Sequence, residues 1–126
     1  MPLLHIALRA GRPEAYRRAL CDSLYRARRE TFNVPEDDEF MLITEHDAAN
    51  FRYSPTYMGV ARSDGLVFIQ ITANNTRTLE QKKALYQRIT QLLGESPGVR
   101  PEDVFISLVE VAKENWSFGH GLAQYA

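Results

Sequence analysis

The residue with the clearest chemical potential is Pro2, which follows the initiator methionine and opens an apolar run from Leu3 to Leu8. A residue this small at position 2 permits removal of the methionine, which leaves a secondary amine at the head of a strand. Such an amine can act as acid, base or nucleophile, because an α-amino group titrates near about 8 and its surroundings shift that value either way. Proline also suits the first residue of a strand for structural reasons alone, since it has no backbone N–H to donate.

A second candidate is Arg77, which stands immediately before the sequence Thr78-Leu79-Glu80-Gln81. This sequence is a capping box, a signature of a helix start. The guanidinium and the N–H groups of the first helical turn would then face one place, which is a favourable site for a carboxylate. The alternative is that Arg77 is a solvated residue ahead of a helix.

The elements that must position these residues form a repeat. Residues 2–46 and 66–110 are both predicted to fold as strand, helix, strand, and matching residues such as Phe40 and Phe105 are 65 positions apart. An internal duplication of a βαβ unit explains this constant separation. The predicted strands are Leu3–Leu8, Glu39–Glu45, Leu66–Thr72 and Val104–Glu110, and the predicted helices are Pro13–Thr31 and Leu79–Leu93.

The fold class is therefore α/β (α+β): one domain over residues 1–126, with tandem βαβ units forming a four-stranded mixed sheet and two helices on one face. Residues 47–65 form the linker, in which a short strand is predicted at Tyr57–Ala61, and residues 111–126 form a C-terminal segment. The strands read as apolar on both faces, so both faces of the sheet need cover. Right-handed crossovers place both helices on one side, and we expect the other side to be buried against another subunit.

Composition excludes several classes of protein. With 126 residues, 44% of them hydrophobic, the chain is long enough for one core, and its net charge of −1 gives no reason to expect nucleic acid. No apolar run is long enough to span a bilayer and no signal peptide is recognisable, which predicts a cytoplasmic protein. Cys21 is expected to be a small buried apolar residue. A solvated helix face is predicted to hold a group of arginines: Arg12, Arg17, Arg18, Arg26, Arg28 and Arg29.

Several segments together resemble the tautomerase superfamily, and within it the malonate semialdehyde decarboxylase group. The resemblance spans nearly the whole chain, and its most specific part lies near the C-terminus. Besides Pro2 and the doubled βαβ plan, it rests on Val34-Pro-Glu-Asp-Asp38, Arg77-Thr-Leu-Glu-Gln-Lys82 and Trp116-Ser-Phe-Gly-x-Gly-x-Ala-Gln124. It implies a homotrimer of duplicated βαβ subunits, with the amino-terminal proline in an apolar pocket at one end of the sheet.

The resemblance also assigns roles to single residues. The family's catalytic proline falls on Pro2, its acidic residue on Asp38 and one substrate-binding arginine on Arg77. The decarboxylases carry a second arginine two positions earlier, where this chain has Asn75, and an aspartate before the tryptophan, where it has Asn115. The carboxylate site of this chain thus has one arginine where the group has two.

The implied substrate is a small oxo-carboxylate, and two mechanisms of decarboxylation stay open. Protonated Pro2 can hydrogen bond to the carbonyl oxygen and stabilise the enolate left by carbon dioxide, or neutral Pro2 can attack the carbonyl and form an iminium ion. Asp38 would set the charge of Pro2 or activate a water molecule. Neither route needs a cofactor or a metal. The alternatives are a keto-enol tautomerase with Pro2 as general base, and an inactive trimeric binding or scaffold module.

Simpler explanations exist for the other candidate residues. Asp38 can be a turn cap after Pro35. Trp116, Phe118 and Tyr125 can be packing residues, or, as a C-terminal flap, they can wall the pocket of a neighbouring subunit. The three histidines, at positions 5, 46 and 120, lack the spacing of metal ligands.

Overall fold

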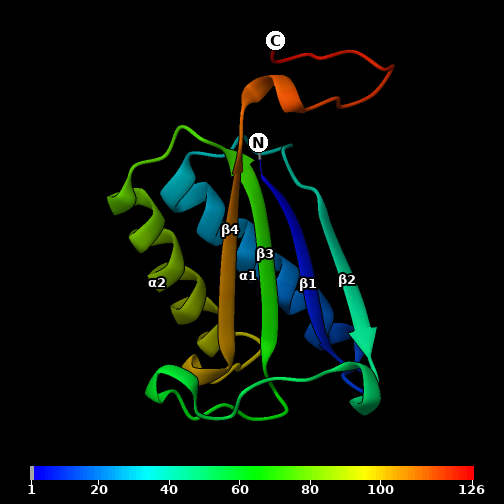
Figure 1. Cartoon of the computed structure of the whole chain (residues 1–126), viewed down its shortest axis with the longest axis vertical. Coiled ribbons are helices and arrows are strands. Elements are labelled where there is room, and N and C mark those ends of the chain that lie inside the picture. Colours follow the sequence, from blue (N-terminus) through cyan, green and yellow to red (C-terminus); the bar gives the residue numbers. More distant parts are fainter. Residues whose placement is uncertain (1) are drawn as a thin grey trace.

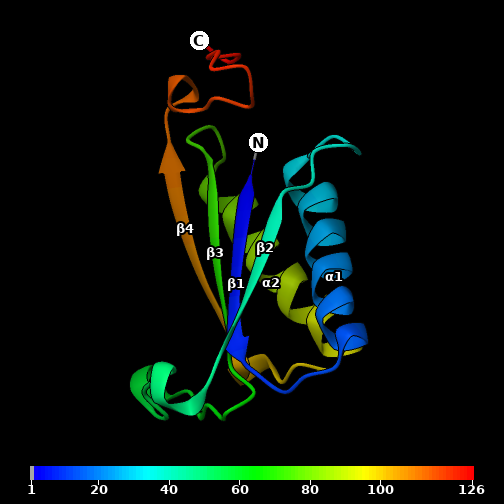
Figure 2. The same ribbon diagram turned by 90° about the vertical axis from the view of Figure 1, so that its right-hand side faces the viewer.

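The computed structural model describes residues 2–126, which form one mixed sheet and two long helices (Figure 1). The sheet order is β2-β1-β3-β4, parallel within each half and antiparallel between β1 and β3. Both helices pack on the same face (Figure 2). The elements are β1 (Leu3–Arg9), α1 (Glu14–Phe32), β2 (Met41–His46), β3 (Val67–Asn74), α2 (Leu79–Glu95) and β4 (Val104–Val111). The predicted fold class is confirmed, and each predicted boundary lies within two residues of the observed one.

The duplication is visible in the strand register. In the first half Leu4 lies opposite Met41, and in the second half Ile69 lies opposite Ile106. Both members of the second pair stand 65 residues after those of the first. Because β1 and β3 are antiparallel, the two halves point in opposite directions. The starts of β1 and β2 and the ends of β3 and β4 therefore lie at the same end of the sheet.

The helices begin and end where local chemistry directs. In α2 the capping box is complete: Thr78 Oγ1 accepts from the backbone N–H of Gln81 at 3.2 Å, and Gln81 Oε1 accepts from that of Thr78 at 2.9 Å. In α1 Pro13 is the N-cap in extended conformation, not the first helical residue as predicted. The helix ends at Asn33, whose φ of 53° is left-handed. Among residues 2–126 no helix combines the length and the apolar character that crossing a bilayer requires.

The predicted solvated face of α1 is wrong at Arg28. Its side chain is 0% exposed and belongs to the row of core-facing residues that includes Leu24 and Phe32. Leu24, Arg28 and Phe32 are four residues apart, which puts them on one side of a helix. The helical period was therefore the signal that placed Arg28 inside, and its charge was the misleading one.

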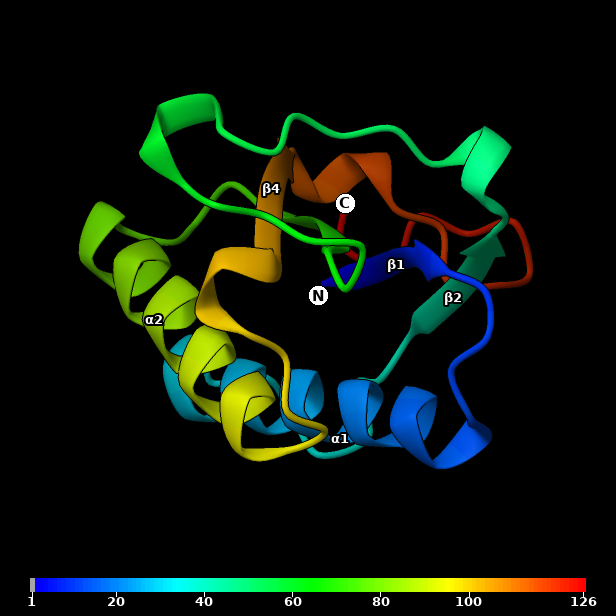
Figure 3. The same cartoon turned by 90° about the horizontal axis from the view of Figure 1, so that it is seen from below.

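The predicted strand at Tyr57–Ala61 is also wrong. The chain forms a short 3-10 turn over Tyr57–Gly59, with φ of 62° at Met58 and 71° at Gly59. Two successive left-handed residues cannot continue a pleated strand. The linker instead crosses the side of the sheet away from the helices (Figure 3).

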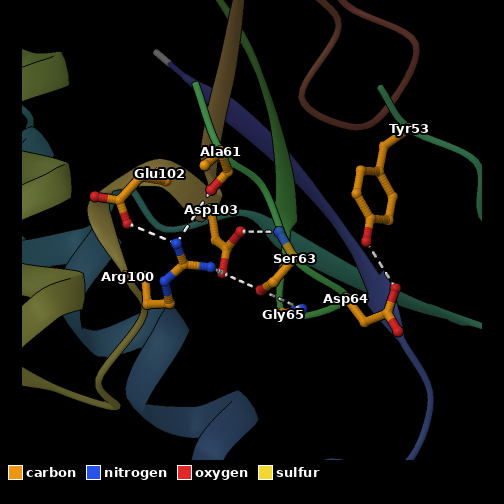
Figure 4. A network of polar contacts seen from close by, with 8 residues as sticks. All are labelled: Tyr53, Ala61, Ser63, Asp64, Gly65, Arg100, Glu102 and Asp103. Atoms are coloured by element: carbon orange, nitrogen blue, oxygen red, sulfur yellow. Dashed lines mark hydrogen bonds and ion pairs between the residues drawn. The ribbon is translucent and has the colours of Figure 1, made fainter. Parts of the chain in front are cut away.

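Asp103 anchors the linker to the second half of the chain. This carboxylate is buried, and it accepts hydrogen bonds from the backbone N–H of Ser63 at 2.8 Å and from the Ser63 hydroxyl at 2.6 Å. Arg100 approaches the same carboxylate at 3.4 Å and donates to the Ala61 carbonyl at 3.1 Å (Figure 4). These contacts thus join the linker to the segment before β4, about 40 positions later in the chain, at the end of the sheet remote from Pro2.

We expect Asp103→Ala to lower the free energy of unfolding by about 2–3 kcal/mol, because the Ser63 donors would lose a charged, buried acceptor. Asp64→Ala is the matched control. Asp64 accepts a hydrogen bond from the Tyr53 hydroxyl at 2.7 Å and pairs with Arg9 at 2.8 Å, but its side chain is mostly exposed. The loss of the Asp64 carboxylate should therefore cost less than about 1 kcal/mol. Urea unfolding of both variants measures the difference, and equal losses would contradict the anchoring role.

The sheet face away from the helices is only partly apolar. It exposes Leu42 at 62% and Phe105 at 44%, but also His5, Gln70 and Ser107. The prediction that the strands are apolar on both faces therefore holds for some positions only. Phe68 lies in edge contact with Phe105 at 5.2 Å between ring centroids and belongs to the same face. Large exposed apolar side chains gathered on one sheet face are typical of a protein interface.

Candidate active site

Pro2 and Asp38 both lie at the end of the sheet where β1 and β2 begin. The backbone N–H of Leu4 donates to the Phe40 carbonyl at 3.0 Å, and Pro2 and Asp38 each stand two residues before this pair in parallel strands. Pro2 is buried. The strand register thus brings a proline nitrogen and a carboxylate to the same edge, and Figure 1 shows the N-terminus there.

Asp38 is a partly buried carboxylate. Burial raises its pKa above the ordinary value, with Asp37 adding to the rise, whereas Arg28 and Arg77 act in the opposite direction. Its backbone N–H closes a turn to the Pro35 carbonyl at 3.1 Å, but its buried Oδ1 has no hydrogen-bond partner among the described residues. The side chain is therefore not a turn cap, which was the simpler explanation.

Arg77 is half-buried and held from one side. Its NH2 group donates to the Phe32 carbonyl at 3.1 Å, and its guanidinium carbon lies 4.8 Å from the centre of the Phe32 ring. Burial lowers the pKa of Arg77, and the charge of Asp38 opposes that change. No carboxylate among residues 2–126 lies within 4 Å of its nitrogens. Arg77 is thus not a fully solvated residue ahead of a helix, which was the alternative, and its guanidinium can bind an anion.

A hollow of about 310 Å³ lies next to Asp38. We call it the Asp38 hollow; it is lined by Pro35, Asp37, Asp38, Phe40, Phe118 and Tyr125. The last two belong to residues 112–126, the C-terminal flap, which folds over this edge of the sheet (Figure 2). The flap therefore walls a hollow of its own chain.

Aromatic contacts and side-chain hydrogen bonds shape the flap. Trp116 stacks on Phe118 at 5.6 Å, and Phe118 meets Tyr125 edge-on at 4.9 Å. The Trp116 indole N–H donates to Asn74 Oδ1 at 2.8 Å, which fixes the flap to the end of β3. Gln124 Oε1 accepts from the backbone N–H of Phe118 at 3.0 Å. Trp116 thus acts as support, while Phe118 faces the hollow.

Asn75 does not line the hollow. It is exposed, and its backbone N–H donates to the Val111 carbonyl at 3.0 Å. The capping box also occupies the N–H groups of Thr78 and Gln81, so these two do not add to an anion site beside Arg77 as expected. The sequence interpretation missed Arg28, whose charge acts on Asp38, and Asp37 and Phe40, which line the hollow.

This end of the sheet combines the nitrogen of Pro2, the partly buried carboxylate of Asp38, the half-buried guanidinium of Arg77 and an aromatic wall. A guanidinium with unpaired donors recognises a small carboxylate, and desolvation strengthens that attraction. No group of three or more His, Cys, Asp or Glu that could hold a metal ion occurs within residues 2–126. The geometry suits a small organic anion.

Comparisons with known proteins agree with this arrangement. Two family profiles, both described as tautomerase enzyme, match residues 38–119 and 2–61. The probable tautomerase YusQ of Bacillus subtilis (strain 168) is 44% identical over 124 residues, covering 98% of both chains. The probable tautomerase YrdN of the same strain is 31% identical over 125 residues, covering 99% of this chain and 96% of the relative.

Solved structures extend the comparison. Malonate semialdehyde decarboxylase, a protein with decarboxylase and hydratase activities, superimposes with a TM-score of 0.92 at 32% identity, over 98% of this chain and 95% of that one. FG41 malonate semialdehyde decarboxylase inhibited by 3-bromopropiolate gives a TM-score of 0.91 at 36% identity, over 98% and 93%. A fused 4-OT symmetric trimer, at 23% identity and a TM-score of 0.80 over 98% and 97%, shares the fold. The chain therefore belongs to the tautomerase superfamily, as an enzyme of the decarboxylase or the tautomerase type.

Proposed function

We propose that this protein is a cofactor-independent decarboxylase of a small oxo-carboxylate of the malonate semialdehyde type, with the amine of Pro2 as its reactive group. The observation that carries the proposal is the position of Pro2, Asp38 and Arg77 at the same end of the sheet, where Asp38 is the one of the three that lines the hollow. The likeness to two malonate semialdehyde decarboxylases over nearly the whole chain supports it.

In this mechanism Arg77 binds the substrate carboxylate and fixes the carbon–carbon bond that will break. That bond gives its electron pair to the neighbouring carbonyl as carbon dioxide leaves. Protonated Pro2 stabilises the resulting enolate through a hydrogen bond to its oxygen, and the carbon that lost carbon dioxide then takes up a proton. Alternatively, neutral Pro2 condenses with the carbonyl with loss of water, and the iminium ion accepts the same electron pair; protonation of the carbon and hydrolysis of the iminium ion then release the product. Phe118 and Tyr125 limit access of water to the hollow.

A second candidate is keto-enol tautomerisation with neutral Pro2 as general base. The names of the two Bacillus relatives favour it. The deciding experiment assays protein of known amino-terminal mass against malonate semialdehyde and the enol of phenylpyruvate. Decarboxylation of the first supports our proposal, and turnover of the enol alone supports the tautomerase. Absence of both activities in processed protein would leave the inactive binding or scaffold module.

The Asn75 position tests substrate choice. We expect Asn75→Arg to raise malonate semialdehyde turnover, because a second cation beside Arg77 adds carboxylate binding at an exposed position that can accept a long side chain. Ketonisation of the phenylpyruvate enol should change little. Steady-state kinetics on both substrates decides, and parallel changes in the two activities would show that this position does not set the preference.

The uncovered sheet face supports the proposal of a homotrimer. Apolar side chains such as Leu42 and Phe105 need cover, and one copy of the chain has a mass of 14.4 kDa. We expect light scattering at micromolar concentration to give about three times that mass. Leu42→Lys should shift the protein towards monomer, whereas Leu79→Lys, equally exposed but on α2, should not. A compact monomer in the unmodified protein would contradict the trimer.

A further inference from the structure

Arg28 is the most unusual charged residue of the fold. Its side chain is 0% exposed on the core side of α1, and none of its three guanidinium nitrogens has a hydrogen-bond partner among the described residues. A guanidinium stays protonated in proteins. A buried and unpaired cation is costly, so the charge of Arg28 needs an anion nearby.

The segment before β2 lies close to Arg28: the Arg28 guanidinium carbon is 5.8 Å from the centre of the Tyr25 ring, and the Tyr25 hydroxyl donates to the carbonyl of Glu36, two residues before Asp38. Four titratable groups act on the charge of Arg28. Cys21 and Tyr25 come from α1 itself, and Asp38 and Glu39 come from the segment that leads into β2. Burial lowers the pKa of Arg28, and among the groups that oppose this change the Asp38 carboxylate acts most strongly. Glu39 is exposed to solvent, which screens its charge. Asp38 is thus the principal counter-charge of Arg28.

Arg28 and Asp38 each act on the other's charge, but they do not form a contact ion pair. Asp38 Oδ1 is buried and also lacks a hydrogen-bond partner among residues 2–126. No nitrogen of Arg28 lies within 4 Å of a carboxylate oxygen in that part of the chain. Interactions between buried charges are weakly screened, so Arg28 acts on Asp38 from the core side while Arg77 acts on it from the start of α2.

We propose that Arg28 is a positioning residue, which keeps Asp38 charged at the Asp38 hollow and thereby leaves the charge of Arg77 to the substrate. The roles of Asp38 and Arg77 in this inference rest on the proposed function. Arg28 and Arg77 both act to lower the pKa of Asp38. Arg28 therefore supplies part of the positive charge that Asp38 would otherwise draw from Arg77 alone, and a substrate carboxylate can pair with Arg77.

The first experiment measures the Asp38 side-chain carboxyl by NMR titration in Arg28→Met, which keeps the length of the side chain but removes its charge. We expect the Asp38 pKa to rise by about one unit or more relative to the unmodified protein. Arg29→Met is the matched control, since Arg28 and Arg29 are both 5.8 Å from the Tyr25 ring but Arg29 is exposed. An unchanged Asp38 pKa in folded Arg28→Met would overturn the proposal.

A second experiment needs no substitution at Arg28, in case that variant does not fold. The Arg28 Nε–Hε signal of the unmodified protein should shift with pH along the same midpoint as the Asp38 carboxyl. The shift should vanish in Asp38→Asn and persist in Asp37→Asn, which removes the exposed neighbouring carboxylate instead. A signal that ignores the Asp38 midpoint would overturn the proposal.

Activity gives a third and separate readout. In Arg28→Met we expect the acidic limb of the kcat–pH profile to move to higher pH by the same amount as the Asp38 pKa, with little change in KM, because Asp38 then loses its charge at a higher pH. Arg28→Lys, which restores a cation, should recover part of this shift; no recovery would count against a charge effect. If the unmodified protein decarboxylates nothing, the proposed function fails, whereas both NMR experiments still decide the coupling of Arg28 to Asp38.

Discussion

Protein that begins at Pro2 should be active, and protein that retains Met1 should be inactive. Retention makes the Pro2 nitrogen a tertiary amide, which is neither basic nor nucleophilic, so the activity should be proportional to the processed fraction. Mass spectrometry of the intact chain gives that fraction, and samples of differing fraction, assayed on malonate semialdehyde, give the slope. Equal activity at both extremes would exclude an amino-terminal proline mechanism.

Pro2→Ala separates the amine from the ring. The variant keeps a free amino group after processing, but it replaces a secondary amine fixed at the strand start by a primary, more mobile one. We expect kcat to fall by about 10²-fold or more, the range that one positioned acid or base contributes. The matched control is Leu3→Ala, which shortens the neighbouring side chain and leaves the amine of Pro2 in place. A similar loss in both variants would indicate damage to the strand and not to the chemistry.

Arg77→Met should produce the second large loss. Truncating one partner of a desolvated charge pair costs about 2–5 kcal/mol, which corresponds to a fall in kcat/KM of roughly 30- to 5,000-fold. Arg77→Lys should recover little, because an ammonium cannot present the planar pair of donors that a carboxylate accepts. Steady-state kinetics on malonate semialdehyde provides the measurement.

Lys83→Met is the control for Arg77→Met. Lys83 is an exposed cation on α2, 4.0 Å from Glu80, and its loss should leave kcat/KM within about twofold. Because Arg77 also packs on Phe32, the thermal unfolding of Arg77→Met has to be compared with that of the unmodified protein. A stable Arg77→Met variant with unchanged kcat/KM would move the anion site elsewhere.

The fold could be predicted from sequence because its signals are local. Apolar periodicity located the strands and helices, the capping box set the start of α2 at Leu79, and the 65-residue repeat required the second half to copy the first. The prediction of a strand at Tyr57–Ala61 failed for a physical reason. Left-handed geometry at Met58 and Gly59 is a property of the folded loop, which a short apolar run does not reveal.

The candidate site was predictable only where the residues stand at element ends. Pro2 and Arg77 were singled out from their places at the start of a strand and before the capping box, and Asp38 from the resemblance to the tautomerase superfamily. The strand order and directions put the start of β1, the start of β2 and the end of β3 at one end of the sheet. Arg28 and Asp103 were not recognised. In each case a charged side chain is buried by partners distant in sequence, and a helical or strand pattern records the position of such a residue without showing what compensates its charge.

The anchoring of the linker by Asp103 makes the two halves of the repeat different in role. Asp103 and Arg12 stand 65 residues from Asp38 and Arg77, and both approach Gly65: a Cβ there would lie 3.3 Å from Asp103 Oδ2 and 3.4 Å from an Arg12 nitrogen. Val67, the counterpart of Pro2, is a residue within the chain and has no amine to offer. Asp103, the counterpart of Asp38, therefore has no amine to act on, and it serves to anchor the linker through Ser63. Gene duplication doubled the scaffold but, on the proposed mechanism, not the number of reaction centres, which stays at one for each chain.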